Sequence, residues 1–132
     1  MAKKTIQTIG KRKTALAKAT LSAGKGTIRI NHQLLDTIQP ELLRQRLMEP
    51  LILSDDTWQK VNINVSVSGG GMQGQTEAAR IAIARALVEF NKKLKKPFLD
   101  YDRHLLVQDI RVRETRKPND SKARASRQKS YR

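Results

Sequence analysis

The sequence predicts one small domain that mixes β-strands with α-helices, followed by a basic arm without a core of its own. Residues 61–68 alternate β-branched and small polar side chains, which is typical of a strand with one buried face. Residues 79–94 carry apolar side chains at helical spacing. Residues 115–132 contain no Leu, Ile, Val, Met, Phe or Trp. We therefore divide the 132 residues into a globular domain over 1–114 and an extended tail over 115–132.

The first half of the domain is predicted to be mainly β-structure. Residues 5–21 have the pattern of an extended chain, interrupted by a basic cluster that follows Gly10. The Gly-containing segment 22–26 indicates a turn, and residues 27–30 are expected to return as the second strand of a hairpin. A helix is predicted to begin at Pro40 and Glu41, with its extent limited by Pro50.

The second half is predicted to contain one clear strand and one long helix. The strand over residues 61–68 ends in a run of three glycines, and the helix follows from about Gln75 to Lys95. Ala82 and Ala86 on this helix would let its backbone approach a sheet closely. A brief buried strand is expected over residues 105–112, before the tail.

The charge balance points to a polyanionic partner. There are 27 Lys and Arg residues against 12 Asp and Glu, a formal net charge of +15. The tail alone carries seven cations and one acid, Asp120, so it is expected to be disordered in water and to order only against dense negative charge. We take RNA as the first candidate. Aromatic residues make up only 4% of the chain, which argues against a reader that stacks successive bases.

The composition also excludes several classes of site. The chain has no cysteine, which rules out disulfides, thiolate zinc sites and cysteine nucleophiles and is compatible with a reducing cytoplasm. No apolar run approaches the roughly 18 residues of a membrane span, and no secretory signal pattern is present. His32 and His104 lack metal-ligand neighbours at helical spacing. We predict no catalytic residue, no metal, no cofactor, no membrane partner and no small-molecule substrate.

The glycine run from Gly69 to Gly74 satisfies the G-x-G-x-x-G pattern of dinucleotide sites. The acid that such sites need about 20 residues further on is missing, and the chain is too short for the full nucleotide-binding fold. We favour a strand-to-helix turn whose helix N-terminus faces an RNA phosphate through Gly70 and Gly71, with Arg80 one turn into the helix. A turn that binds nothing remains an alternative.

Two further clusters are candidate phosphate contacts. The basic residues Lys11, Arg12 and Lys13 follow a glycine directly, and with few acids to balance them they favour phosphate contact over an ordinary solvated cluster. The lysines of residues 92–96 are explained equally well by the negative end of a helix dipole and by RNA contact.

Several motifs of the chain resemble the family of the universal ninth protein of the small ribosomal subunit. Residues 10–15 (Gly-Lys-Arg-Lys-Thr-Ala) are similar to its N-terminal signature. Residues 67–71 with Gln75, and then residues 79–87, are similar to its most specific block. Residues 101–109 and the ending Gln-Lys-Ser-Tyr-Arg over 128–132 resemble the archaeal and eukaryotic-cytosolic branch, whereas the bacterial branch typically ends in Ser-Lys-Arg.

The resemblance implies an α+β fold with a mixed sheet of about four strands, backed by helices and containing a left-handed βαβ crossover. It also implies that the body packs on ribosomal RNA and neighbouring proteins in the subunit head. The tail would extend toward transfer RNA in the peptidyl site, with Arg132 at the tip and Tyr131, Lys129 and Arg127 behind it. Residues expected to contact ribosomal RNA are Lys11, Arg12, Lys13, Gly70, Gly71, Arg80, Arg116, Lys117, Lys122 and Arg124.

The sequence therefore predicts a structural, non-enzymatic RNA-binding protein of the cytoplasmic small ribosomal subunit. One alternative is a free-standing protein that compacts nucleic acid, which would share the charge but need no single defined site. The other is a nucleotide-dependent enzyme that uses the glycine loop.

Overall fold

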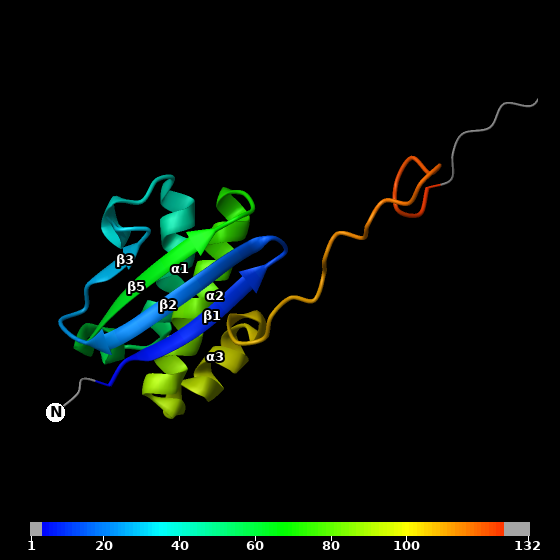
Figure 1. The fold of residues 1–132 in the computed structure, drawn as a ribbon. Helices are drawn as coiled ribbons and strands as arrows, with labels where there is room; N and C mark the ends of the chain where they lie inside the picture. Colours follow the sequence, from blue (N-terminus) through cyan, green and yellow to red (C-terminus); the bar gives the residue numbers. More distant parts are fainter. Residues whose placement is uncertain (1–3, 126–132) are drawn as a thin grey trace, which may run out of the picture.

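The computed structural model describes residues 4–125, in which five strands form one sheet with helices packed against one of its faces (Figure 1). The strands lie in the order β1-β2-β5-β3-β4. Their bounds are β1 Ile6–Arg12, β2 Ala15–Ala23, β3 Ile28–Ile30, β4 Gln33–Leu34 and β5 Val61–Ser68. The α-helices are α1 Glu41–Leu53, α2 Met72–Phe90 and α3 Lys95–Tyr101, and short 3-10 helices span Leu35–Thr37, Thr57–Lys60, Lys92–Leu94 and Arg103–Leu105.

The sheet is mixed, which confirms the predicted α+β class. β1 pairs antiparallel with β2, β2 with β5, and β3 with β4, whereas β3 and β5 run parallel. The chain connects the parallel pair through α1, which lies behind the sheet in Figure 1. With both strands pointing upward in that view, β5 lies to the right of β3, so the crossover is left-handed, against the usual hand of such units.

The predicted hairpin between residues 5–21 and 27–30 is wrong. β2 and β3 are not neighbours, because β5 lies between them and pairs with both. The hairpin instead joins β1 to β2 through a tight turn at Lys13 and Thr14, where Lys13 has a φ of 54°. The basic cluster that appeared to interrupt a strand is therefore the end of a hairpin.

The core forms where α2 crosses β1 and β2, and small side chains allow a very close approach. A Cβ atom at Gly10 would lie 2.7 Å from the backbone nitrogen of Ala82 on α2, and nearer still to the carbonyl oxygen of Ala78. Thr8, two residues earlier on β1, donates a hydrogen bond of 2.8 Å to the carbonyl of Ala82. Gly10 is thus required by helix packing. The buried side chains of β2 and β5 complete this layer: Ala15, Ala17, Ala19, Leu21, Val61, Ile63, Val65 and Val67.

α1 continues past the residue that was expected to limit it. Pro50 lies inside the helix, and it is buried together with Leu51. Proline removes one helical hydrogen bond, but burial of this turn in the core offsets the loss. Ser54 then ends the helix, because its hydroxyl donates to the carbonyl of Leu51 at 2.7 Å.

α2 is shorter than the predicted helix of residues 75–95 and starts earlier, at Met72. It ends at Phe90 because Asn91 adopts an extended conformation and its side chain accepts a hydrogen bond from the Lys93 backbone at 3.2 Å. Leu94 of the predicted apolar stripe is still buried, although it belongs to the next, short helix. The lysines of residues 92–96 therefore do not crowd the last turn of α2.

The predicted strand over residues 105–112 is absent from the described structure. Leu105 ends a 3-10 helix, and residues 106–125 form no helix or strand. The free edge of β1 is engaged differently: Arg85 of α2 donates hydrogen bonds to the carbonyls of Ile9 (2.8 Å) and Leu106 (3.0 Å). The Arg85 side chain thus holds the start of the segment 105–112, which was predicted to pair as a strand. Further along this segment Ile110 is not buried, since 90% of the residue is exposed. Beyond it the chain runs away from the body (Figure 1).

Candidate nucleic-acid interface

The basic cluster and the glycine run, which the sequence separates by more than 50 residues, lie side by side. We call two segments together the tip: residues 11–14, which are the end of β1 and its turn to β2, and residues 69–74, which are the β5–α2 loop and the start of α2. Gly69 and Gly70 have φ values of 76° and 66°, a region that favours glycine. A Cβ atom at Gly70 would lie 3.2 Å from the backbone nitrogen of Ala15, so a larger residue there would crowd the turn. Both loops line one cleft of about 790 Å³.

The N-terminus of α2 opens at the tip. Gly71 is the N-cap residue, and no side chain there accepts a hydrogen bond from the first turn of the helix. The side chain of Gln75 instead donates to the carbonyl of Gly69 at 3.1 Å, which holds the loop against the helix. The first N–H groups of an α-helix have no partner inside the helix and attract anions. Gly70 and Gly71 thus lie where a phosphate could approach, with the exposed Lys13 beside them. Lys11 is also exposed, but it points to the other face of the sheet, because its neighbour Gly10 faces α2.

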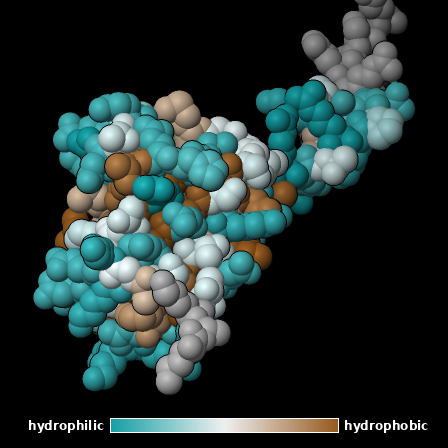
Figure 2. All heavy atoms as spheres, turned by 60° about the vertical axis from the view of Figure 1, so that its left-hand side comes forward, coloured by the Kyte–Doolittle hydropathy of each residue, from teal (hydrophilic) through white to brown (hydrophobic). Residues whose placement is uncertain are grey.

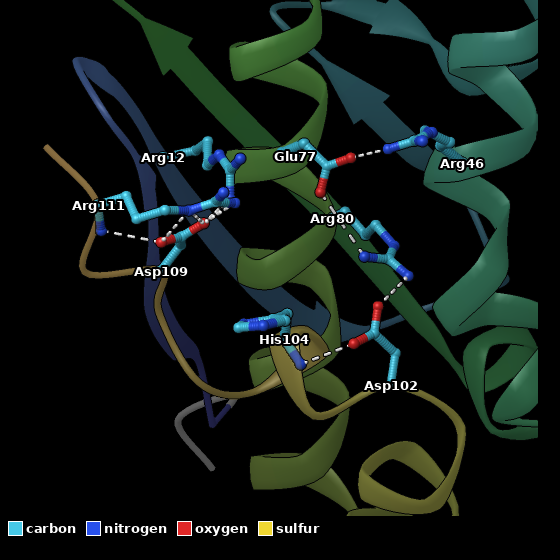
Figure 3. Close-up of polar contacts among 8 residues, drawn as sticks. All are labelled: Arg12, Arg46, Glu77, Arg80, Asp102, His104, Asp109 and Arg111. Carbon is cyan, nitrogen blue, oxygen red and sulfur yellow. Dashed lines mark hydrogen bonds and ion pairs between the residues drawn. The ribbon is translucent and has the colours of Figure 1, made fainter. Parts of the chain in front are cut away.

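Arg80 is directed into the protein (Figure 3). Only 6% of the residue is exposed, and its guanidinium forms ion pairs with Glu77 of α2 and, at 3.2 Å, with Asp102 (Figure 3). It also forms an ion pair with Glu49 of α1. Burial alone would lower the pKa of Arg80, but these carboxylates outweigh it and the pKa is raised. Arg80 therefore joins α1 and α2 to the segment after α3. We had placed this side chain beside a phosphate, and its neighbours are carboxylates.

Asp102 accepts hydrogen bonds both from Arg80 and from the backbone of its own loop. One oxygen accepts the hydrogen bond from Arg80, and the other accepts from the backbone N–H of His104 at 2.9 Å (Figure 3). Burial would raise the pKa of Asp102, but the His104 N–H and the Arg80 guanidinium hold it below its usual range.

A second cluster, which we call the tail clasp, consists of Arg12, Asp109 and Arg111 (Figure 3). Asp109 is only 7% exposed and forms an ion pair with Arg12 at the end of β1. Its oxygens also accept hydrogen bonds from the backbone N–H and the side-chain Nη2 of Arg111, both at 2.8 Å. These bonds and the charge of Arg12 hold the pKa of Asp109 well below its usual range. The clasp fixes the chain to the body where the arm departs.

The clasp was not predicted from the sequence. Arg12 was predicted to contact phosphate together with Lys11 and Lys13, and Asp109 was expected to lie in the strand over residues 105–112. The structure gives the three residues of the basic cluster different surroundings: Arg12 pairs with Asp109, while Lys11 and Lys13 are exposed. The two partners are 97 positions apart, and the only local signal was an aspartate within two residues of an arginine.

The described part of the tail is exposed. Glu114, just before it, pairs with Lys117 (3.3 Å) and with Arg124 (2.8 Å), which draws residues 114–124 into a loop. Arg116 and Lys122 lie exposed on the same segment. The residues predicted to contact transfer RNA, Arg127, Lys129, Tyr131 and Arg132, lie outside the described residues.

Other classes of site find no support in residues 4–125. No group of three His, Cys, Asp or Glu side chains there could hold a metal ion. None of the helices described there is both long and apolar enough to cross a membrane. These features define a small, basic α+β protein whose cationic tip and arm extend from one compact body.

Comparison with known proteins gives the family. The profile of the family described as ribosomal protein S9/S16 matches residues 10–132. Small ribosomal subunit protein uS9 from Methanococcus maripaludis strain C7 is 46% identical over 133 aligned residues, which cover 98% of this chain and 99% of that protein. The uS9 protein of strain C5 shows the same identity and coverage. The chain belongs to the ribosomal protein S9/S16 family. The predicted resemblance is confirmed, and the archaeal relatives agree with the predicted branch.

If Arg80 is a structural residue, its removal should destabilise the fold. Arg80→Met would leave the carboxylates of Glu49, Glu77 and Asp102 close together without their shared cation. Loss of one partner from a buried ion pair costs about 3–5 kcal/mol, so we expect a loss of that size in urea unfolding. Arg44→Met removes a surface pair with Glu41 and one hydrogen bond to the carbonyl of Asp36, and should cost only about 1 kcal/mol. Equal effects of the two substitutions would contradict this role.

The tail clasp should make stability depend on pH. The pKa of Asp109 is lower in the folded protein than in the unfolded chain, where it is about 4. The clasp therefore stabilises the fold above pH of about 4, and this contribution is lost as the pH falls through the lowered pKa. Asp109→Asn should lose less unfolding free energy between neutral and acidic pH than the wild type, as measured by urea unfolding at several pH values. Asp55→Asn, in an exposed loop, should follow the wild-type curve.

Proposed function

We propose that this protein is a structural constituent of the small ribosomal subunit that binds ribosomal RNA and catalyses no reaction. Its tip and arm are the RNA-binding parts, and the arm extends toward transfer RNA in the peptidyl site. The observation that carries the proposal is the convergence, at one end of the sheet, of exposed lysines, an uncapped helix N-terminus and the start of a cationic arm. The curated relatives that match nearly full length are named as small ribosomal subunit proteins.

The distribution of ion pairs supports this proposal. Glu49, Glu77, Asp102 and Asp109 are paired with arginines within the body. Because internal arginines neutralise these acids, the remaining excess of cations faces outward. The view in Figure 2 shows apolar side chains as separate patches on a mainly hydrophilic surface. Such a surface suits phosphate contacts, which position a protein on RNA without reading its sequence.

Within the body, Lys11 and Lys13 with the backbone of Gly70 and Gly71 are the proposed ribosomal RNA contacts. Arg12 supports them through the tail clasp, and Arg80 supports them through the packing of α2. Along the arm, Arg116, Lys117, Lys122 and Arg124 would contact ribosomal RNA. Arg127, Lys129, Tyr131 and Arg132 would lie nearest the transfer RNA.

A free-standing protein that compacts nucleic acid is the remaining alternative, because the net charge of +15 suits it equally. The two functions differ in stoichiometry and salt resistance. A subunit constituent should co-sediment with small subunits in high salt at one copy each. A compacting protein should dissociate from them and coat free RNA or DNA without a fixed ratio.

Deletion of residues 115–132 tests the role of the arm. The deletion removes seven cations, and each neutralised phosphate contributes roughly 0.7 to 0.9 to the salt dependence of binding. We call the dependence of the logarithm of the binding constant for small-subunit RNA on the logarithm of salt concentration the salt slope. The deletion should therefore lower the salt slope by at most about 5 to 6. Filter binding at several salt concentrations measures it.

The body supplies the internal control for this deletion. Urea unfolding of the truncated protein should match the full chain, because the sheet and helices lie before residue 106. An unchanged salt slope in a stably folded truncated protein would show that the arm does not touch phosphates.

Deletion of Arg132 alone tests the proposed contact with transfer RNA. Loss of this terminal cation should weaken transfer RNA binding in the peptidyl site while leaving small-subunit assembly intact. Reconstituted subunits lacking this one residue, compared with the wild type for transfer RNA affinity and for sedimentation, provide the measurement. Failed assembly of the variant subunits would instead make the residue an architectural anchor.

A further inference from the structure

One face of the sheet carries no helix. α1 and α2 cover the other face (Figure 1), and the side chains that alternate with the core residues point away from them. Strand register aligns these outward residues in rows across the sheet. Gln7, Thr20, Asn64 and Arg29 form one row over four strands, and Ile9, Lys18 and Ser66 form the next. We call these two rows the open face.

The open face has a single sign of charge. Lys18 and Arg29 are exposed on it, and Lys11 continues it toward the tip. The outward-facing positions of β1, β2, β3 and β5 include no Asp or Glu. The remaining side chains are mostly hydroxyls and amides, which can donate and accept hydrogen bonds. The face is also hollowed, with a depression of about 720 Å³ lined by Lys18, Thr20, Arg29, Asn64 and Ser66.

This chemistry fits an RNA backbone better than a protein partner. Cores of protein interfaces are enriched in aromatic residues and depleted in lysine, and these four strands contain no aromatic residue. The lack of aromatic side chains also leaves no platform on which unpaired bases could stack. An RNA helix instead presents phosphates and 2′-hydroxyl groups along a wide, shallow groove, and it is recognised through them.

The positions of the two cations suit a ligand that spans the sheet. Lys18 is on β2 and Arg29 is on β3, with β5 between them. Two strand spacings, together with the two-residue step between the rows, separate their Cα atoms by roughly 12 Å. The hydroxyl and amide groups of Thr20, Asn64 and Ser66 fill the space between, where sugar hydroxyls would lie.

We infer that the open face docks the sugar–phosphate backbone of a ribosomal RNA helix, with Lys18 and Arg29 on phosphates and Thr20, Asn64 and Ser66 on riboses. This inference rests on the proposed function and adds a second RNA surface to it. The body is then held on RNA by a broad face as well as by its tip.

The double variant Lys18→Gln/Arg29→Gln tests the inference in the full chain with purified small-subunit RNA. Removal of one phosphate-contacting cation lowers the salt slope of RNA binding by about 1. The slope of the double variant should therefore be lower than that of the wild type by about 2. The matched control Lys25→Gln/Lys60→Gln removes the same charge from loops at the other end of the sheet. It should leave the slope within about 0.5 of the wild type.

A single cysteine supplies a direct measurement, because the chain contains none. An iron chelate attached at Ser66→Cys should cleave base-paired RNA by local hydroxyl radicals, whereas the same chelate at Asp56→Cys in a distant loop should not. Urea unfolding of each variant establishes that these exposed substitutions leave the fold intact.

The outcomes separate this inference from the proposed function. If the arm deletion lowers the salt slope and the Lys18/Arg29 variant does not, the open face does not bind RNA and the inference fails alone. Cleavage confined to unpaired RNA, or a defect seen only when other ribosomal proteins are added, would also overturn it. If the wild type binds small-subunit RNA without salt dependence, both proposals fail.

Discussion

The close packing of α2 on β1 and β2 is the constraint on which the rest of the structure depends. It requires a residue without a side chain at Gly10 and small side chains at Ala15, Ala78 and Ala82, because backbone atoms of helix and strand nearly touch there. The same packing places the start of α2 beside the β1–β2 turn. The arrangement of the tip therefore follows from core packing, and the proposed phosphate contacts need no further structural element. The glycines and cations of this motif combine residues that fit the core with residues that are exposed.

Ion pairing divides the charged residues into two populations. Arg80 and Arg12 neutralise carboxylates that hold α1, α2 and the start of the arm together. Lysines such as Lys11, Lys13 and Lys18 remain exposed. Arginine suits the internal role because its planar guanidinium forms several hydrogen bonds in fixed directions, whereas lysine acts as a mobile point charge. Because these ion pairs remove cations and acids together, most of the net charge of +15 remains on the exposed surface.

Local patterns predicted the elements better than their partners. The alternation in residues 61–68 identified β5, and the apolar stripe identified most of α2, because each pattern reflects burial on one side of a regular element. The pairing of β5 between β2 and β3 was missed because strand order depends on contacts between distant residues. The strand expected over residues 105–112 failed for a similar reason. In the structure this segment meets the edge of β1 through Arg85, which donates hydrogen bonds to the carbonyls of Ile9 and Leu106.

Family resemblance supplied what patterns could not, including the mixed sheet and the left-handed crossover. Neither source revealed that Arg80 is buried and that Arg12 pairs with Asp109, because the local sequence around a basic residue does not show whether it faces solvent or a distant carboxylate. The partners Glu49, Asp102 and Asp109 lie 31, 22 and 97 positions away from the arginines that they bind. Pairing over such separations is decided only when the helices have packed.

The loop between Glu114 and Arg124 gives the arm a variable length. One exposed carboxylate closes it, and ion pairs of this kind are worth only about 0–1 kcal/mol each. If the loop opens, the ten peptide units that it takes up could add roughly 35 Å of extended chain. The clasp at Asp109 would stay in place meanwhile, so the body need not move. Opening this loop would therefore lengthen the reach of the arm without unfolding the body.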